Sequence, residues 1–160
     1  MITTIRVPPQ PQEVEKDGKK GIILAPPRIG LLQQGAIIPV RIAHPEILNK
    51  APGADKTRFD KIVQVNAVID TGAFTSVITI ETAKELDLIQ TGWQQTSTVL
   101  SDDKRPVYFA ALMFPWGPAM HTKVISCALR GNIRCLLGRD VLSNWNFIYN
   151  GKEGFFTICD

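Results

Sequence analysis

The chain has 160 residues, of which 44% are hydrophobic and 21% charged, so it can bury the core of one domain and is neither disordered overall nor fibrous. The net charge of +3, from 18 Lys and Arg against 15 Asp and Glu, is too small to indicate nucleic-acid binding by itself. No apolar run reaches the roughly 18 residues that cross a membrane, so we expect neither a nucleic-acid partner nor a membrane partner.

The first part of the chain predicts a flexible arm followed by a domain. Residues 1–20 combine several prolines with many charged side chains, a composition typical of a mobile arm. We therefore expect the domain to span residues 21–160. Short apolar and β-branched runs predict strands at Gly21–Leu24 and Ala36–Ala43, and the prolines and glycine of residues 44–61 predict a long loop.

The middle of the chain holds the clearest secondary-structure signals. Ile62–Ile69 (IVQVNAVI) alternates at first and then becomes wholly apolar, which predicts a strand that is buried on both faces at its end. Thr79 is a typical N-cap for a short helix that ends before Gly92. Two further strands are expected at residues 96–100 and 107–113, with a polar tip at residues 101–105 between them.

The C-terminal third predicts more strands and a second short helix. The strands are expected at residues 123–129, 135–137, 146–149 and 155–159, and the helix at Val141–Trp145. The last two strands form a hairpin whose turn carries Asn150-Gly151. Many short strands, one or two short helices and no alternation of strands with helices predict a mainly β fold, a small closed barrel.

The cysteine and histidine content argues against a metal centre. Cys127, Cys135 and Cys159 cannot all pair within one chain, no CxxC motif occurs, and the chain has only two histidines. We therefore expect no metal site and no cofactor. Reduced thiols, and a beginning (MITTIRVPPQPQ) without the continuous apolar stretch of a secretory signal, predict a cytoplasmic protein.

The segment with the strongest chemical signal is Val68-Ile69-Asp70-Thr71-Gly72-Ala73. A carboxylate at the end of an apolar strand is costly to bury, so it needs donors, which Thr71 and the backbone N–H groups of Gly72 and Ala73 can supply. Gly72 also permits close approach by a ligand backbone or another chain. Taken alone, Asp-Thr-Gly favours an ordinary turn at the end of a strand.

A second segment, Cys135-Leu136-Leu137-Gly138-Arg139-Asp140, is an apolar strand that runs into a glycine and a helix start. In this order, and with room for a hairpin between them, the two segments resemble the retropepsin-like aspartic proteases. In that family an apolar pair followed by Asp-Thr/Ser-Gly-Ala comes first, and a later apolar pair followed by Gly-Arg-Asp/Asn opens the C-terminal helix. The resemblance extends from about Ala36 to Asp160 and implies a barrel of the retropepsin type.

The resemblance implies an aspartic endopeptidase that acts on a peptide or protein substrate. Such enzymes use two carboxylates that share one proton: one activates a water as a base, and the other polarises the scissile carbonyl and later protonates the leaving amine. Because this chain has one Asp-Thr-Gly, the second Asp70 must come from the other chain of a homodimer. The resemblance places Thr71 in a contact across the dimer beneath the carboxylates, and Gly72 against the substrate backbone.

The resemblance also implies a flap, a hairpin that closes over an extended peptide and excludes water. We place it around Ser101–Arg105 and assign Ala73, Ser101, Asp102 and Asp103 to substrate binding. The tip has no glycine, unlike the tips of many viral members, and its alternative interpretation is a solvated β-turn.

Phe74 is a second departure from the viral pattern. Viral members usually carry an aspartate at this position, and it pairs with the arginine of the later helix. Phe74 cannot accept a charge, so the sequence leaves the partner of Arg139 open. Asp140 is the nearest candidate, although adjacent helical residues do not face each other.

Two other interpretations of the chain remain open. One is a non-catalytic module of the same fold that dimerises or binds extended peptides as added strands. The other is a general β-barrel interaction domain in which the motif occurs by chance. The intact Asp-Thr-Gly favours the enzyme, because a pure binder has no need to hold two buried carboxylates together.

Overall fold

The computed structural model describes residues 1–16, 18–49, 58–97 and 102–159. The chain divides into two compact units: Ile38–Ser143, and a second made of Met1–Ile37 with Asn144–Asp160. In the ranges described, no helix is both long and apolar enough to cross a membrane.

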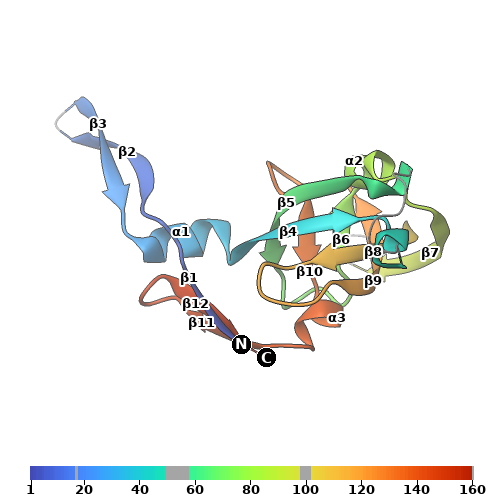
Figure 1. Ribbon diagram of the computed structural model, residues 1–160. Helices are drawn as coiled ribbons and strands as arrows, with labels where there is room; N and C mark the ends of the chain where they lie inside the picture. Colours follow the sequence, from blue (N-terminus) through green and yellow to red (C-terminus); the bar gives the residue numbers. More distant parts are fainter. Residues whose placement is uncertain (17, 50–57, 98–101, 160) are drawn as a thin grey trace. The chain divides into compact units, whose positions relative to one another are not determined.

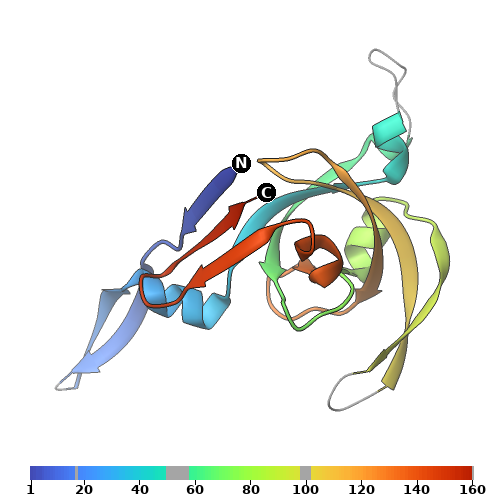
Figure 2. The same cartoon turned by 90° about the horizontal axis from the view of Figure 1, so that it is seen from below.

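The unit Ile38–Ser143 is built on one seven-stranded sheet in the order β4-β5-β10-β6-β9-β8-β7. A further pairing of β4 with β8 closes six of these strands into a ring (Figures 1 and 2). The strands are β4 (Ile37–Ala43), β5 (Ile62–Ile69), β6 (Val77–Thr79), β7 (Gln90–Ser97), β8 (Asp102–Met113), β9 (Met120–Cys127) and β10 (Cys135–Leu137). The prediction of a mainly β closed barrel is therefore confirmed.

The core of the barrel is built from alternating buried residues, and the alternation is clearest in β5. In β5 the side chains of Val63, Val65, Ala67 and Ile69 are buried, and the residues between them are exposed or half-buried. Since successive side chains of a strand point to opposite faces, this pattern puts every second residue inside the ring. Strand β5 has the bounds that the sequence predicts.

The position of the site is set by β10, which lies between β5 and β6. Strand β10 runs parallel to β5, with Leu137 opposite Ile69, and antiparallel to β6. The residues that follow β5 and β10, Asp70 and Gly138, therefore emerge at the same end of the sheet. The Asp70 backbone N–H donates to the carbonyl of Leu137 at 2.9 Å, which fixes this register at the strand ends.

The helices of this unit are short. Helix α2 (Ile80–Glu85) begins at the predicted N-cap, because the Thr79 hydroxyl accepts a hydrogen bond from the Thr82 backbone N–H at 3.2 Å. The predicted second helix is α3 (Arg139–Leu142), which begins two residues earlier than the sequence indicates. The predicted loop over residues 44–61 contains the 3-10 turns η1 (Pro45–Asn49) and η2 (Arg58–Asp60), and residues 50–57 lie outside the described ranges.

The hairpin predicted over residues 96–113 is present as strands β7 and β8, but the strands begin and end at other residues than predicted. Strands β7 and β8 pair from Gln90 opposite Tyr108 to Ser97 opposite Asp102. The sequence placed Asp102 and Asp103 in the tip, whereas both belong to strand β8; the predicted tip residue Ser101 lies outside the described ranges. Strand β7 is mostly polar, so apolar alternation could not mark where it begins.

The second unit contains a three-stranded sheet, a hairpin and a helix. The sheet has the order β1-β12-β11, and the hairpin consists of β2 and β3. The elements are β1 (Ile2–Arg6), β2 (Gln10–Lys16), β3 (Lys19–Ala25), α1 (Pro27–Gln34), β11 (Asn146–Asn150) and β12 (Phe155–Cys159). The predicted C-terminal hairpin is present, with Gly154 at φ 70° in its connection.

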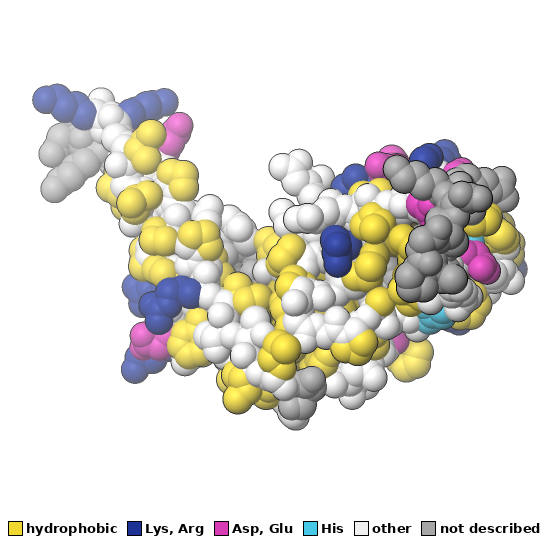
Figure 3. Space-filling view, in the orientation of Figure 1, with side chains coloured by type: hydrophobic (Ala, Val, Ile, Leu, Met, Phe, Trp, Pro, Cys, Tyr) yellow, Lys and Arg dark blue, Asp and Glu magenta, His cyan; other side chains and the backbone are white. Residues whose placement is uncertain are grey.

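Most of the described residues of 1–20 lie in strands β1, β2 and β3, although their composition predicts an arm. Strand β1 pairs with β12 over its whole length, from Ile2 opposite Cys159 to Arg6 opposite Phe155, and a pairing this distant in sequence leaves no local signal. On the hairpin β2–β3, apolar side chains gather at the surface (Figure 3), and Ile22, Ile23 and Leu24 are exposed. The mobility expected of the arm remains a prediction.

Cys135 provides a test of the barrel core. Burial raises the pKa of the Cys135 thiol to about 12, and the nearby Asp140 carboxylate acts in the same direction. Only the thiolate reacts with alkylating agents, so we expect native Cys135 to stay unmodified by iodoacetamide at about pH 8 and to react after unfolding in guanidinium chloride. Peptide mass spectrometry measures both states. Labelling of native Cys135 at the rate seen in the unfolded chain would contradict this packing.

Candidate active site

Asp70 occupies a tight turn that directly follows β5. Its carboxylate oxygen Oδ1 accepts hydrogen bonds from the backbone N–H groups of Gly72 at 2.9 Å and Ala73 at 3.2 Å. The side chain is half-buried, and its Oδ2 has no hydrogen-bond partner in the part of the chain that the structure describes. The turn therefore orients the carboxylate with one oxygen and leaves the other for an external ligand.

The turn is attached to the later motif by a buried hydroxyl. Ser76 is fully buried, and its Oγ donates to Asp140 Oδ1 at 2.7 Å while it accepts from the Gly138 backbone N–H at 3.0 Å. The Ser76 backbone N–H donates to Asp140 Oδ2 at 2.9 Å. Both oxygens of Asp140 are thus engaged, and residues 62 to 64 positions apart in sequence are locked together.

Backbone hydrogen bonds extend this attachment towards Asp70. The N–H of Arg139 donates to the carbonyl of Ala73 at 2.9 Å, and the N–H of Asp140 donates to the carbonyl of Phe74 at 3.2 Å. The approach requires glycine at position 138, because a Cβ there would lie 2.8 Å from the Thr75 carbonyl carbon. The second motif therefore supports the Asp70 turn from beneath.

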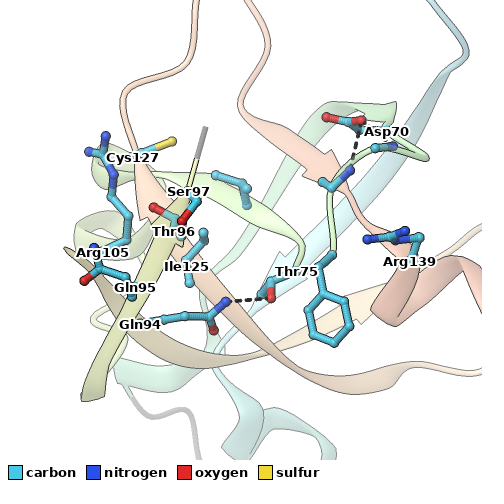
Figure 4. Close-up of a pocket in the computed structure, with 14 residues that line it drawn as sticks. Asp70, Thr75, Gln94, Gln95, Thr96, Ser97, Arg105, Ile125, Cys127 and Arg139 are labelled. Atoms are coloured by element: carbon cyan, nitrogen blue, oxygen red, sulfur yellow. Dashed lines mark hydrogen bonds between the residues drawn. The ribbon is translucent and has the colours of Figure 1, made fainter. Parts of the chain in front are cut away.

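A pocket of about 740 Å³ lies beside the turn. Figure 4 shows Asp70 and Arg139 on one side of it, and Gln94, Gln95, Arg105 and Cys127 on the other. Val77 and Ile125 add apolar surface from the adjoining strands β6 and β9. The pocket combines one carboxylate, two guanidinium groups and apolar walls.

A side-chain hydrogen bond joins the two sides of the pocket. Gln94 Nε2, from β7, donates to the hydroxyl of Thr75 at 3.0 Å (Figure 4). Gln94 Oε1 is buried and has no hydrogen-bond partner among the residues that the structure describes. A buried acceptor left in this state is costly, so the pocket favours a ligand that offers an N–H group.

The predicted site residues are not all gathered at this pocket. Asp70, Gly72 and Ala73 line it, and Thr71 is exposed in the same turn. Asp103 is not among the lining residues, and its carboxylate accepts from Arg105 at 2.7 Å.

Most of the lining residues are absent from the sequence-based assignment, among them Thr75, Gln94, Cys127 and Arg139. Arg139 was singled out only for its missing partner. The sequence could not indicate Gln94, because its position at the pocket depends on how β7 pairs with β8, and this pairing register is not readable from local sequence. Burial raises the pKa of the Cys127 thiol, and the Arg105 charge acts in the opposite direction.

In the described ranges no group of three His, Cys, Asp or Glu side chains is placed to hold a metal ion. All three cysteines are free thiols.

No protein-family model matches the sequence, and no curated protein matches it. Among solved structures, the fold matches a retropepsin-like aspartic protease from Rickettsia conorii, with 18% identity, 77% of this chain and 91% of that chain covered, and a TM-score of 0.46. The chain is similar to retropepsin-like aspartic proteases of known structure.

Two further matches are of the same kind. The EIAV protease in complex with the inhibitor HBY-793 is 23% identical, over 51% of this chain and 76% of that chain, with a TM-score of 0.40. The retroviral protease-like domain of Ddi1 from Leishmania major is 14% identical, over 77% of this chain and 88% of that chain, with a TM-score of 0.42.

The Ser76 hydroxyl can be tested as the support of the Asp70 turn. The variant Ser76→Ala leaves the buried Gly138 N–H without its acceptor and removes one donor from Asp140, so we expect the free energy of unfolding to fall by about 1–3 kcal/mol. The matched control is Ser143→Ala, an exposed serine next to the same helix, which should change stability by less than about 0.5 kcal/mol. Urea unfolding measures both. Equal effects of the two variants would contradict a supporting role for Ser76.

Proposed function

We propose that this protein is an aspartic endopeptidase that hydrolyses peptide bonds with a water activated by two Asp70 carboxylates, one from each chain of a homodimer. The observation that carries the proposal is the state of Asp70: one oxygen is held by two backbone N–H groups, the other has no partner among the described residues, and the carboxylate faces a pocket. An ordinary surface turn has no need of a buried support such as Ser76 and Asp140.

The second carboxylate must come from another copy of the chain. Among the described residues that line the pocket, Asp70 is the one acidic residue, whereas acid–base hydrolysis requires both a base and an acid. A two-fold axis that passes beside Asp70 supplies both from a single motif. Thr71 is exposed in this turn, and we assign its hydroxyl to the contact across the dimer.

The two carboxylates act with one shared proton. The ionised Asp70 removes a proton from water as the water oxygen attacks the scissile carbonyl carbon, and the protonated Asp70 gives its proton to the carbonyl oxygen. The tetrahedral diol then collapses and its C–N bond breaks. The Asp70 that took the proton from water gives it to the leaving nitrogen. The other Asp70 takes a proton from one of the diol hydroxyls. The carboxylates thereby return to their starting state.

An extended peptide is the substrate that the pocket suits. A Cβ at position 72 would lie 3.2 Å from Asp70 Oδ1, so glycine keeps the space beside the carboxylate open. We assign Gly72 and Ala73 to contacts with the substrate backbone. The unpartnered Gln94 Oε1 is an acceptor for a peptide N–H. We further assign closure over the peptide to the hairpin β7–β8, with Ser101, Asp102 and Asp103. Three free thiols suit a reducing, cytoplasmic compartment.

The variant Asp70→Asn tests the carboxylate directly. An amide cannot take up or release the shared proton, so we expect cleavage of a peptide library to fall at least about 100-fold, with the dimer still present in sedimentation. The matched control is Asp87→Asn, an exposed residue at φ 50°, a conformation that Asn also tolerates. Undiminished turnover by Asp70→Asn would reject the mechanism. An inactive wild-type protein that nevertheless binds peptides would favour the non-catalytic module.

Dilution tests the composite site. A monomer holds one Asp70 and therefore has no activity, so we expect the initial rate per mole of chain to fall as the protein is diluted below its dimer dissociation constant. The rate is measured over several decades of concentration, alongside sedimentation at the same concentrations. A dilute sample that sediments as a monomer and keeps its full specific activity would contradict the homodimeric site.

A further inference from the structure

We propose that Arg139 and Phe74 form a carboxylate-binding subsite next to Asp70, so that the enzyme prefers peptides that place a carboxylate close to the scissile bond. The carboxylate comes either from an Asp or Glu side chain or from the free C-terminus of the peptide. This inference rests on the proposed function, because it names the class of peptide that the Asp70 site accepts.

The first observation is that the charge of Arg139 is not neutralised. Arg139 is exposed and lines the pocket. Its backbone N–H is used by the carbonyl of Ala73, but its guanidinium makes no hydrogen bond and no ion pair within the described ranges. The carboxylate that follows it, Asp140, is occupied by the N–H and Oγ of Ser76.

The second observation distinguishes Arg139 from the other arginine of the pocket. Arg105 is paired with Asp103, with 2.7 Å between Nη2 and Oδ2, so its charge is largely satisfied before any ligand arrives. On the Asp70 side of the pocket, Arg139 is the one cationic residue in the lining (Figure 4). An anionic ligand group therefore binds more favourably at Arg139 than at Arg105.

The third observation is the platform on which the guanidinium rests. The Arg139 Cζ atom lies 5.9 Å from the centroid of the Phe74 ring, which is within the range of a cation–π contact. Phe74 itself is 73% exposed, an unusual state for a large aromatic side chain. The ring restrains the guanidinium from one side without using its N–H donors, which leaves the planar fork for a second group.

The ligand that fits such a fork is a carboxylate. A guanidinium on a restrained side chain binds a carboxylate through two parallel hydrogen bonds, and these charge-assisted bonds are stronger than neutral ones. Peptides supply this group from an acidic side chain or from the C-terminus. The ligand carboxylate must approach Arg139 from the end away from Asp70, because two adjacent anions repel.

The experiment uses the full-length protein and two arms of synthetic peptides. In the first arm a cleavable, amidated peptide carries a single Asp or a single Asn at each position around the scissile bond. In the second arm neutral peptides end at successive positions after the scissile bond, as a free acid or as an amide. We expect one position, in one arm, at which the carboxylate raises kcat/KM by about tenfold, equivalent to about 1.4 kcal/mol.

The variants assign that preference to Arg139. Arg139→Gln should reduce the ratio of kcat/KM for acidic against neutral peptide to about one, and Arg139→Lys should retain part of it, because the charge remains but the fork is lost. The matched control is Arg130→Gln, an exposed arginine outside the pocket lining, which should keep the wild-type ratio. The preference should also shrink in high salt. Thermal melting of each variant checks that it is folded.

The outcomes separate this inference from the proposed function. If the protein cleaves peptides but shows no Arg139-dependent preference for a carboxylate at any position of either arm, the subsite is overturned. The proposed peptidase activity is then unaffected. A weaker dimer in Arg139→Gln, with an unchanged ratio, would also overturn it, because Arg139 would then serve the second copy.

If the wild-type protein cleaves nothing, fluorescence anisotropy of the same peptides with Asp70→Asn, and with the double variant that adds Arg139→Gln, replaces the rate. Tighter binding of the acidic peptides that is lost in the double variant would support the subsite. Equal binding of acidic and neutral peptides, or no binding of either, would overturn it.

Discussion

The hydrogen bonds of one buried serine hold the candidate site together. Ser76 Oγ joins the segment after β5 to the segment after β10 by donating to Asp140 and accepting from Gly138. Such bonds contribute modestly when they form, but a buried donor or acceptor that loses its partner costs considerably more. These bonds couple the Asp70 turn to Gly138 and to the start of α3, so none of the three can move without the others. The pocket wall that they form is therefore rigid.

This constraint explains why neighbouring acidic and basic residues have different tasks. Asp140 has both oxygens committed to the Ser76 segment, so its charge supports the scaffold and is unavailable to Arg139. With an aromatic ring at position 74, Arg139 rests on an apolar surface instead of pairing with a carboxylate. The same local arrangement that fixes Asp70 thus leaves one cation facing the pocket.

Local patterns predicted the parts of the fold that short-range interactions determine. Apolar alternation gave Ile62–Ile69, and capping chemistry gave the helix after Thr79. Helix α1 was not predicted, although Pro27 at its first turn is a typical helix start. Only Gly30 and Leu31 of this helix are buried, so its sequence carries little apolar periodicity. The pairing of β1 with β12 and the meeting of Gln94 with Thr75 were beyond reach, since both depend on contacts between residues distant in sequence.

The two walls of the pocket differ in how firmly they are tied. The Asp70 wall is anchored by several charge-assisted and backbone bonds, whereas the β7–β8 wall meets it through the side-chain bond from Gln94 to Thr75. A neutral hydrogen bond contributes only about 1 kcal/mol net, and Gln94 already has a buried oxygen without a partner. A peptide that supplies an N–H to that oxygen can offset the loss of the Thr75 bond. Adjustment to a ligand therefore falls on the hairpin, while the carboxylate stays in place.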